Sequence, residues 1–108
     1  MILAAALVEK QPASLINQHF GRCEWYGIYN TASGSKTFIQ NPESGEAAGS
    51  VVAEMLIEQG VSMVVAGRFG IKVLDVFQKN NVQMIIPGGN QKWADMINMV
   101  EHGLIGKI

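Results

Sequence analysis

The stretch ILAAALV, from Ile2 to Val8, is continuously apolar, and the polar residues Glu9 and Lys10 follow it. An apolar run of this length, without alternation, is typical of a central β-strand that is covered on both faces. Strands of this kind belong to α/β proteins, in which helices pack against the sheet. The run is short and lacks a basic flank, so it does not match a signal peptide. The stretch therefore predicts a sheet that is built outward from this strand.

The residues that follow alternate between strand and helix patterns. Two short β-patterned segments, joined by a turn containing Gly34, extend the first strand into a three-strand meander. Apolar residues then recur at helical spacing, with strands between the helices. After the first strand, the predicted elements are strands at Trp25–Tyr29 and Lys36–Gln40, a helix at about Glu46–Gln59, a strand at Val61–Ala66, a helix at Ile71–Lys79, a strand at Val82–Ile86, and a helix between an Asn90 N-cap and Gly103. The predicted class is α/β, with a five-stranded mixed sheet and the order βββαβαβα.

This order of elements predicts where a ligand binds. A meander places the third strand parallel to the first, and right-handed helical crossovers place the fourth and fifth parallel to it as well. Four strands then end at one edge of the sheet, together with residues 9–24, 41–48, 66–70 and 87–90. Because ligands of open α/β sheets bind at such edges, the functional site is expected there.

Composition excludes several classes of partner. The 108 residues, 48% hydrophobic and 16% charged, are typical of one globular domain with a core of its own. Eight basic and nine acidic residues leave a net charge of −1, so no long-range field favours nucleic acid or an anionic membrane. The single cysteine, Cys23, excludes an internal disulfide and fits a reducing compartment. We therefore expect a cytoplasmic protein that binds neither nucleic acid nor membrane.

The most distinctive motif is HFGRC, at residues 19–23, in the long loop after the first strand. His19 and Cys23 are residue types that bind metals, and Arg22 adds a guanidinium between them. Two residues fall short of the four ligands of a closed zinc site. Two interpretations stay open at this point. The pair is either a set of metal ligands, or a loop histidine bonded to the backbone beside a buried structural cysteine.

A second motif, AGRFG at residues 66–70, lies between a predicted strand and a helix. Its small residues expose backbone amides, and a helix N-terminus favours negative charge, so the motif predicts an anionic ligand near Arg68. The alternative is a tight turn that carries a solvated arginine. The later turn PGGN, at residues 87–90, is interpreted as a turn with a helix cap.

The chain lacks the residue sets that catalysis requires. A metal-dependent nuclease on a sheet of this kind needs clustered carboxylates, one of them on the first strand, and that strand has none. Asp75 and Asp95 lie within predicted helices. Neither a nucleophile with its base nor a Walker-type phosphate loop is present in the sequence. We expect a protein that is not an enzyme.

The HFGR loop, the aromatic strand after it, the Gly60-Val61 step and the segment VVAGRFG at residues 64–70 together resemble the dinitrogenase iron-molybdenum cofactor biosynthesis family. This family includes NifX-like proteins and the C-terminal domain of NifB-like proteins. The resemblance covers nearly the whole chain and implies a single domain of this type at residues 1–108. It also implies a three-layer α/β/α, ribonuclease H-like fold without the nuclease carboxylates.

The resemblance further implies a small carrier for iron-molybdenum cofactor or an iron-sulfur cluster, with donor or acceptor cofactor-assembly proteins as partners. His19 matches the histidine of the family's loop and is the implied cluster ligand, and Cys23 is a second metal-ligand candidate by its chemistry. The candidate cofactor-binding residues are His19, Phe20, Gly21, Arg22, Gly67, Arg68 and Gly70. Many members carry a histidine shortly before their middle glycine, where this chain has Ser44-Gly45-Glu46. A metal-free module that binds a small anion or a partner protein is the alternative.

Overall fold

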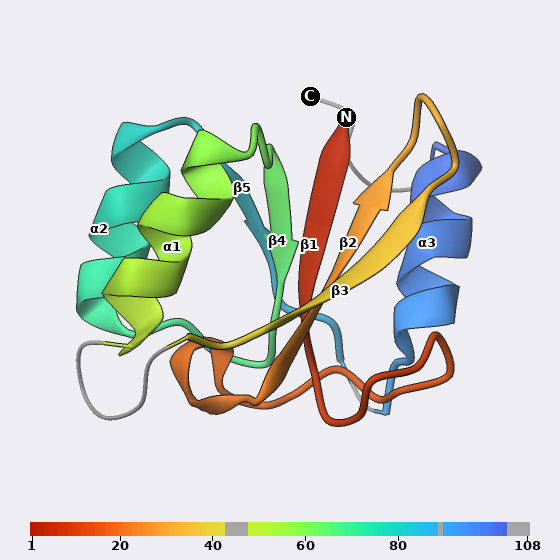
Figure 1. Cartoon of the computed structure of the whole chain (residues 1–108), viewed down its shortest axis with the longest axis horizontal. Coiled ribbons are helices and arrows are strands. Elements are labelled where there is room, and N and C mark those ends of the chain that lie inside the picture. The colour runs from red at the N-terminus through yellow and green to blue at the C-terminus, as the bar shows by residue number, and fades with distance from the viewer. Residues whose placement is uncertain (43–47, 89, 104–108) are drawn as a thin grey trace.

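The computed structural model describes residues 1–42, 48–88 and 90–103. One mixed five-stranded sheet, with strand order β3-β2-β1-β4-β5, lies between helices (Figure 1). The elements, in chain order, are β1 (Ile2–Leu7), the 3₁₀ turn η1 (Phe20–Arg22), β2 (Trp25–Asn30), β3 (Lys36–Gln40), α1 (Ala48–Glu58), β4 (Met63–Val65), α2 (Ile71–Lys79), β5 (Gln83–Ile85) and α3 (Trp93–Glu101). The predicted α/β class and the mixed sheet are confirmed.

The pairing of the strands gives four of them the same direction. β2 is antiparallel to β1, and β3 is antiparallel to β2. β4 is parallel to β1, and β5 is parallel to β4. β1, β3, β4 and β5 therefore end at the same edge, as the meander and crossovers predict.

Helices cover both faces of the sheet. Figure 1 shows α1 and α2 on one side and α3 on the other. Side chains of β1 alternate between the two cores, because successive residues of a strand point to opposite faces. Ala4 and Ala6 belong to the core under α1 and α2. Leu3, Ala5 and Leu7 belong to the core under α3. This two-sided burial is the physical reason for the continuous apolar run.

The core under α3 is centred on Trp93, which is fully buried. Its indole ring lies so close to β2 that a Cβ atom on Gly27 would be 2.7 Å from the ring. The ring of Phe38 meets it edge-on, with 5.3 Å between the centroids. Glycine in the middle of β2 therefore makes room for the tryptophan.

Several element ends differ from those predicted. The N-cap of α3 is Lys92 and not Asn90, because Lys92 pairs with Leu15 in a β-bridge and its N–H donates to Asp95 Oδ2 at 3.2 Å. The strands predicted at 61–66 and 82–86 are three residues each. The expected start of the first helix at Glu46 lies outside the described residues.

Gly60 follows α1 with a φ of 84°, the left-handed conformation of a helix C-terminal cap. None of the helices in the described ranges has the length and apolar character needed to cross a membrane.

Candidate functional site

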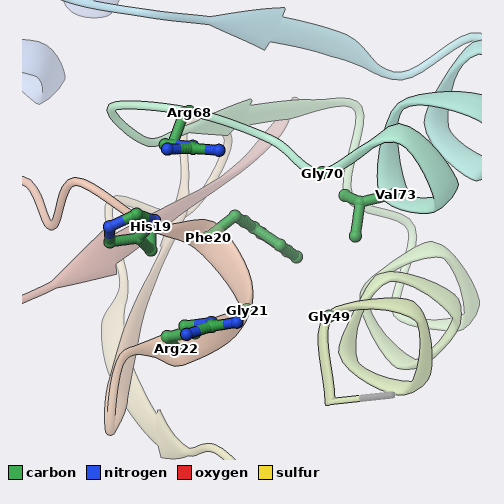
Figure 2. A pocket seen from close by; sticks show the side chains of 8 residues that line it. All are labelled: His19, Phe20, Gly21, Arg22, Gly49, Arg68, Gly70 and Val73. Carbon is green, nitrogen blue, oxygen red and sulfur yellow. The ribbon is translucent and has the colours of Figure 1, made fainter. Parts of the chain in front are cut away.

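A cavity of about 410 Å³ opens where the loop after β1, the loop after β4 and the first turns of α1 and α2 meet (Figure 2). Its lining contains every predicted cofactor-binding residue except Gly67. The lining residues are His19, Phe20, Gly21, Arg22, Gly49, Arg68, Gly70 and Val73. The two motifs singled out in the sequence thus form one site, at the edge that the topology predicts.

Backbone hydrogen bonds join the two motif loops directly. The Phe20 N–H donates to the Arg68 carbonyl at 3.1 Å, and the Gly67 N–H donates to the Asn17 carbonyl at 2.9 Å. The Asn17 side chain also accepts from the His19 N–H at 3.0 Å. The His19 and Arg68 loops are therefore positioned by each other as well as by the strands that they follow.

Gly67 lies behind the cavity and permits this close approach. A Cβ atom at Gly67 would be 2.6 Å from Gln18 Oε1, 2.7 Å from Gln18 Cα and 2.9 Å from the Gln18 carbonyl oxygen. Backbone at these distances leaves no room for a side chain. The candidate role of Gly67 is therefore in loop packing, since it is absent from the lining.

The floor of the cavity is aromatic. Phe20 is 1% exposed, and its ring lies 5.3 Å from Tyr26, 5.5 Å from Phe69 and 5.3 Å from Phe77, measured between centroids. Contacts of this kind contribute beyond the area they bury, and they hold the ring in one orientation. The polar part of the site therefore rests on a rigid apolar base.

The rim of the cavity is positively charged. In Figure 2, Arg68 and Arg22 lie on opposite sides of His19, and all three side chains are exposed. The N-terminus of α2 follows Gly70, which has no side chain to accept hydrogen bonds from the first-turn N–H groups. No acidic residue is among those found to line the cavity in the described part of the chain. This arrangement favours the binding of an anionic ligand.

In the described part of the chain, His19 is the one lining residue of a type that binds metals. His19 offers an imidazole, while the other lining residues are glycine, arginine, phenylalanine and valine. Over the described ranges, no three or more His, Cys, Asp or Glu side chains are grouped so that they could hold a metal ion. As far as it is described, the site supplies one nitrogen ligand, which can bind a group that brings its own coordination.

The structure separates Cys23 from the cavity. Its side chain is buried among the core residues under α1 and α2, and its thiol donates to the Phe20 carbonyl at 3.4 Å. Burial raises the pKa of the Cys23 thiol, so the thiolate needed for metal binding is disfavoured. Of the two interpretations of the HFGRC motif, the position of Cys23 matches a structural cysteine, and that of His19 leaves its ring accessible to a ligand.

Two lining residues were not singled out from the sequence. Gly49, in the first turn of α1, brings this helix against the HFGR loop, because a Cβ atom there would lie 3.4 Å from Gly21 Cα and 2.8 Å from Val73 Cγ2. Val73, the other residue, is 6% exposed and lies in the first turn of α2. A glycine in the first turn of a predicted helix, which is otherwise unfavourable, was the available signal. Residues 87–90, also predicted to lie at this edge, do not contribute to the lining as far as they are described.

The fold and the site define a small α/β protein with a basic, aromatic-floored cavity at the edge of its sheet. The chain belongs to the dinitrogenase iron-molybdenum cofactor family, whose model matches residues 1–103. This family is involved in the biosynthesis and binding of that cofactor. A search of curated protein sequences finds none that matches the chain.

Solved structures share the fold at low sequence identity. The apo form of the orange protein from Desulfovibrio gigas has a TM-score of 0.84 and 15% identity, with 99% of this chain and 92% of that chain covered. PH0822 has a TM-score of 0.79 and 15% identity, with coverage of 95% and 92%. TM1290, a Thermotoga protein that belongs to the DUF35 family, has a TM-score of 0.75 and 21% identity, with coverage of 94% and 88%. At these identities the likeness establishes the fold.

Proposed function

We propose that this protein is a non-catalytic, cytoplasmic binding or carrier protein for an iron-molybdenum or iron-sulfur type cluster, which it holds during cofactor biosynthesis or delivery. The observation that carries the proposal is the placement of one accessible imidazole, His19, between the guanidinium groups of Arg22 and Arg68 at the mouth of a cavity. Family membership supports the choice of cargo.

The chemistry of the cavity suits such a cargo. Imidazole nitrogen is a suitable ligand for iron and other transition metals. Guanidinium groups supply fixed positive charge and several N–H donors, which favour an anionic cluster and its sulfides. The buried Phe20 ring keeps the base of the cavity apolar and rigid. A single protein ligand also permits release to an acceptor, since a closed set of four ligands would retain the cargo.

The same residues give no basis for a reaction. Among the described residues, the lining combines one histidine and two arginines with apolar side chains and glycine, and none of these carries a nucleophilic hydroxyl, thiol or carboxylate. We also propose that the fold is ribonuclease H-like. In this interpretation the apolar strand β1 lies where a nuclease of that fold carries a catalytic carboxylate. Cofactor-assembly proteins that donate or accept the cluster are the proposed partners.

Anaerobic titration with an iron-sulfur or iron-molybdenum-sulfur cluster tests the electrostatic part of this proposal. Arg22→Gln and Arg68→Gln are each expected to weaken binding up to about fivefold, the range for exposed charge interactions. Added salt should weaken wild type more than either variant. Lys36→Gln is the matched control, because this lysine opens β3 at the end of the strand away from the cavity. Affinities of the arginine variants that equal that of Lys36→Gln would contradict the proposal.

A metal-free module for a small anion is the second candidate function, and the presence of a single metal-ligand type in the lining favours it. Calorimetric titration with inorganic phosphate or sulfate distinguishes the two candidates. Binding of either anion that depends on Arg22 and Arg68, in a protein that takes up no cluster, would replace the carrier proposal with this one.

A further inference from the structure

We propose that Cys23 and Tyr26 are positioning residues, which act together on the Phe20 carbonyl oxygen and thereby fix the loop that presents His19 and Arg22. This inference rests on the proposed function of the cavity. It assigns Cys23 a role through hydrogen bonding and not through coordination of the cargo.

Two buried donors converge on one acceptor. The Tyr26 hydroxyl donates to the Phe20 carbonyl, and the Cys23 thiol donates to the same oxygen at 3.4 Å. Tyr26 is fully buried, Cys23 is 4% exposed and Phe20 is 1% exposed. Water is excluded from this place, so a lost donor would not be replaced by solvent. The i→i+3 pattern of η1 also directs the Cys23 backbone N–H to this oxygen, so the two side chains add to a backbone bond and fix the orientation of the carbonyl.

The carbonyl that they hold lies at the centre of the site. Phe20 stands between His19 and the remaining residues of η1, so the orientation of its peptide group sets the directions of the side chains on either side. Two further carbonyls of this loop accept hydrogen bonds from the Asn41 side chain, that of Gly21 at 3.2 Å and that of Cys23 at 3.0 Å. The front of the turn lines the cavity.

The Phe20 N–H extends this support to the second motif, since it donates to the Arg68 carbonyl at 3.1 Å. The Phe20 carbonyl and the Phe20 N–H belong to adjacent peptide groups that share the Phe20 Cα, so a shift at the carbonyl would also disturb the contact with the Arg68 loop. Amide hydrogen exchange at Phe20 reports on this contact without any cargo present.

A double-mutant cycle with Cys23→Ala, Tyr26→Phe and the double variant tests the inference. Each single variant leaves one side-chain donor, so exchange of the Phe20 amide should rise by only about fivefold or less. The double variant removes both buried side-chain donors and leaves only the backbone bond of η1. Because the two donors share one oxygen, its exchange should exceed the product of the two single effects by about fivefold, a coupling typical of groups in one hydrogen-bond network. Cluster affinity should likewise fall by more in the double variant than the product of the two single-variant effects.

A control and a rescue separate positioning from general destabilisation. Ile97→Val lowers stability from the core on the opposite face of the sheet, and it should leave local exchange at Phe20 and cluster affinity unchanged. Cys23→Ser retains a donor and should behave as wild type in both assays. Multiplicative exchange effects in the cycle would overturn the inference.

The serine variant also decides between positioning and coordination. If Cys23→Ser abolishes cluster uptake while Phe20 exchange is unchanged, Cys23 is a ligand and the inference is wrong. If wild type takes up no cluster at all, the proposed function fails, while the exchange cycle on the cargo-free protein still decides whether the two donors act together.

Discussion

The substitution Gly67→Ala tests the idea that the two motif loops form the site by direct contact. The new Cβ atom would stand 2.7 Å from Gln18 Cα and 2.9 Å from the Gln18 carbonyl oxygen, whereas ordinary contact begins at 3.4 Å. The Gln18 backbone must then retreat by 0.7 Å, the difference between 3.4 Å and 2.7 Å. A change of side-chain rotamer cannot relieve a clash with backbone.

We expect Gly67→Ala to lower the free energy of unfolding by about 2 kcal/mol, within the usual range for overpacked positions. For a domain of this size, that corresponds to a fall in Tm of roughly 10 °C. The shift also moves Asn17, whose side chain holds the His19 N–H at 3.0 Å, so cluster affinity should fall as well.

Urea unfolding followed by circular dichroism measures the effect, with Gly88→Ala as the control. Gly88 has open space around its Cβ position and a φ outside the left-handed region, so its substitution should change stability by less than about 0.5 kcal/mol. If Gly67→Ala is as stable as Gly88→Ala, the argument that a close backbone approach builds the site is refuted.

Two further predictions concern the core and the tyrosines. Gly27→Ala should destabilise the protein by about 2 kcal/mol or more, because the Trp93 ring at 2.7 Å is fully buried and cannot move aside; unchanged urea unfolding would contradict this. Burial raises the pKa of Tyr26, and the hydrogen bond to Glu101 raises the pKa of Tyr29, so the unfolded chain loses these protons first as the pH rises. The contribution of the two tyrosines to the free energy of unfolding should therefore be fully present below about pH 10 and be lost above it. Tyr26→Phe should reduce this loss. Phenolate absorbance should appear together with unfolding, and a tyrosine titration near pH 10 in the folded protein would be the opposite result.

Much of the fold follows from local pattern. The uninterrupted apolar run of β1 predicts burial on both faces, and the structure divides its side chains between two cores. The predicted bounds of β3 and α2 match those observed, because a turn and a glycine N-cap mark their ends in the sequence. The N-cap of α3 could not be predicted in the same way, since Lys92 is held by a bridge to Leu15, far away in the chain.

The candidate site, like the fold, was predictable from the sequence only in part. Parallel strand direction brings the HFGR and GRFG loops to one edge, so their meeting was predictable from the order of the elements. The direction in which a loop side chain points depends on contacts from elsewhere. Cys23 turns inward because the Phe20 carbonyl and the core receive it, and Gly67 packs on Gln18 behind the cavity. A prediction from residue type and motif alone made Cys23 a candidate metal ligand and Gly67 a candidate cofactor-binding residue.

The most direct test of the central claim measures iron and acid-labile sulfide in protein that has been purified without oxygen, incubated with cluster and separated from the excess. Wild type, His19→Ala and His102→Ala are compared. The other histidine, His102, is a matched control, because it ends α3 and its ring contacts the Asn98 carbonyl at 2.8 Å. Stoichiometric uptake by wild type and His102→Ala, with loss in His19→Ala, is the predicted result. Equal uptake by all three proteins, or uptake by none, would contradict a cluster carrier that binds its cargo through His19.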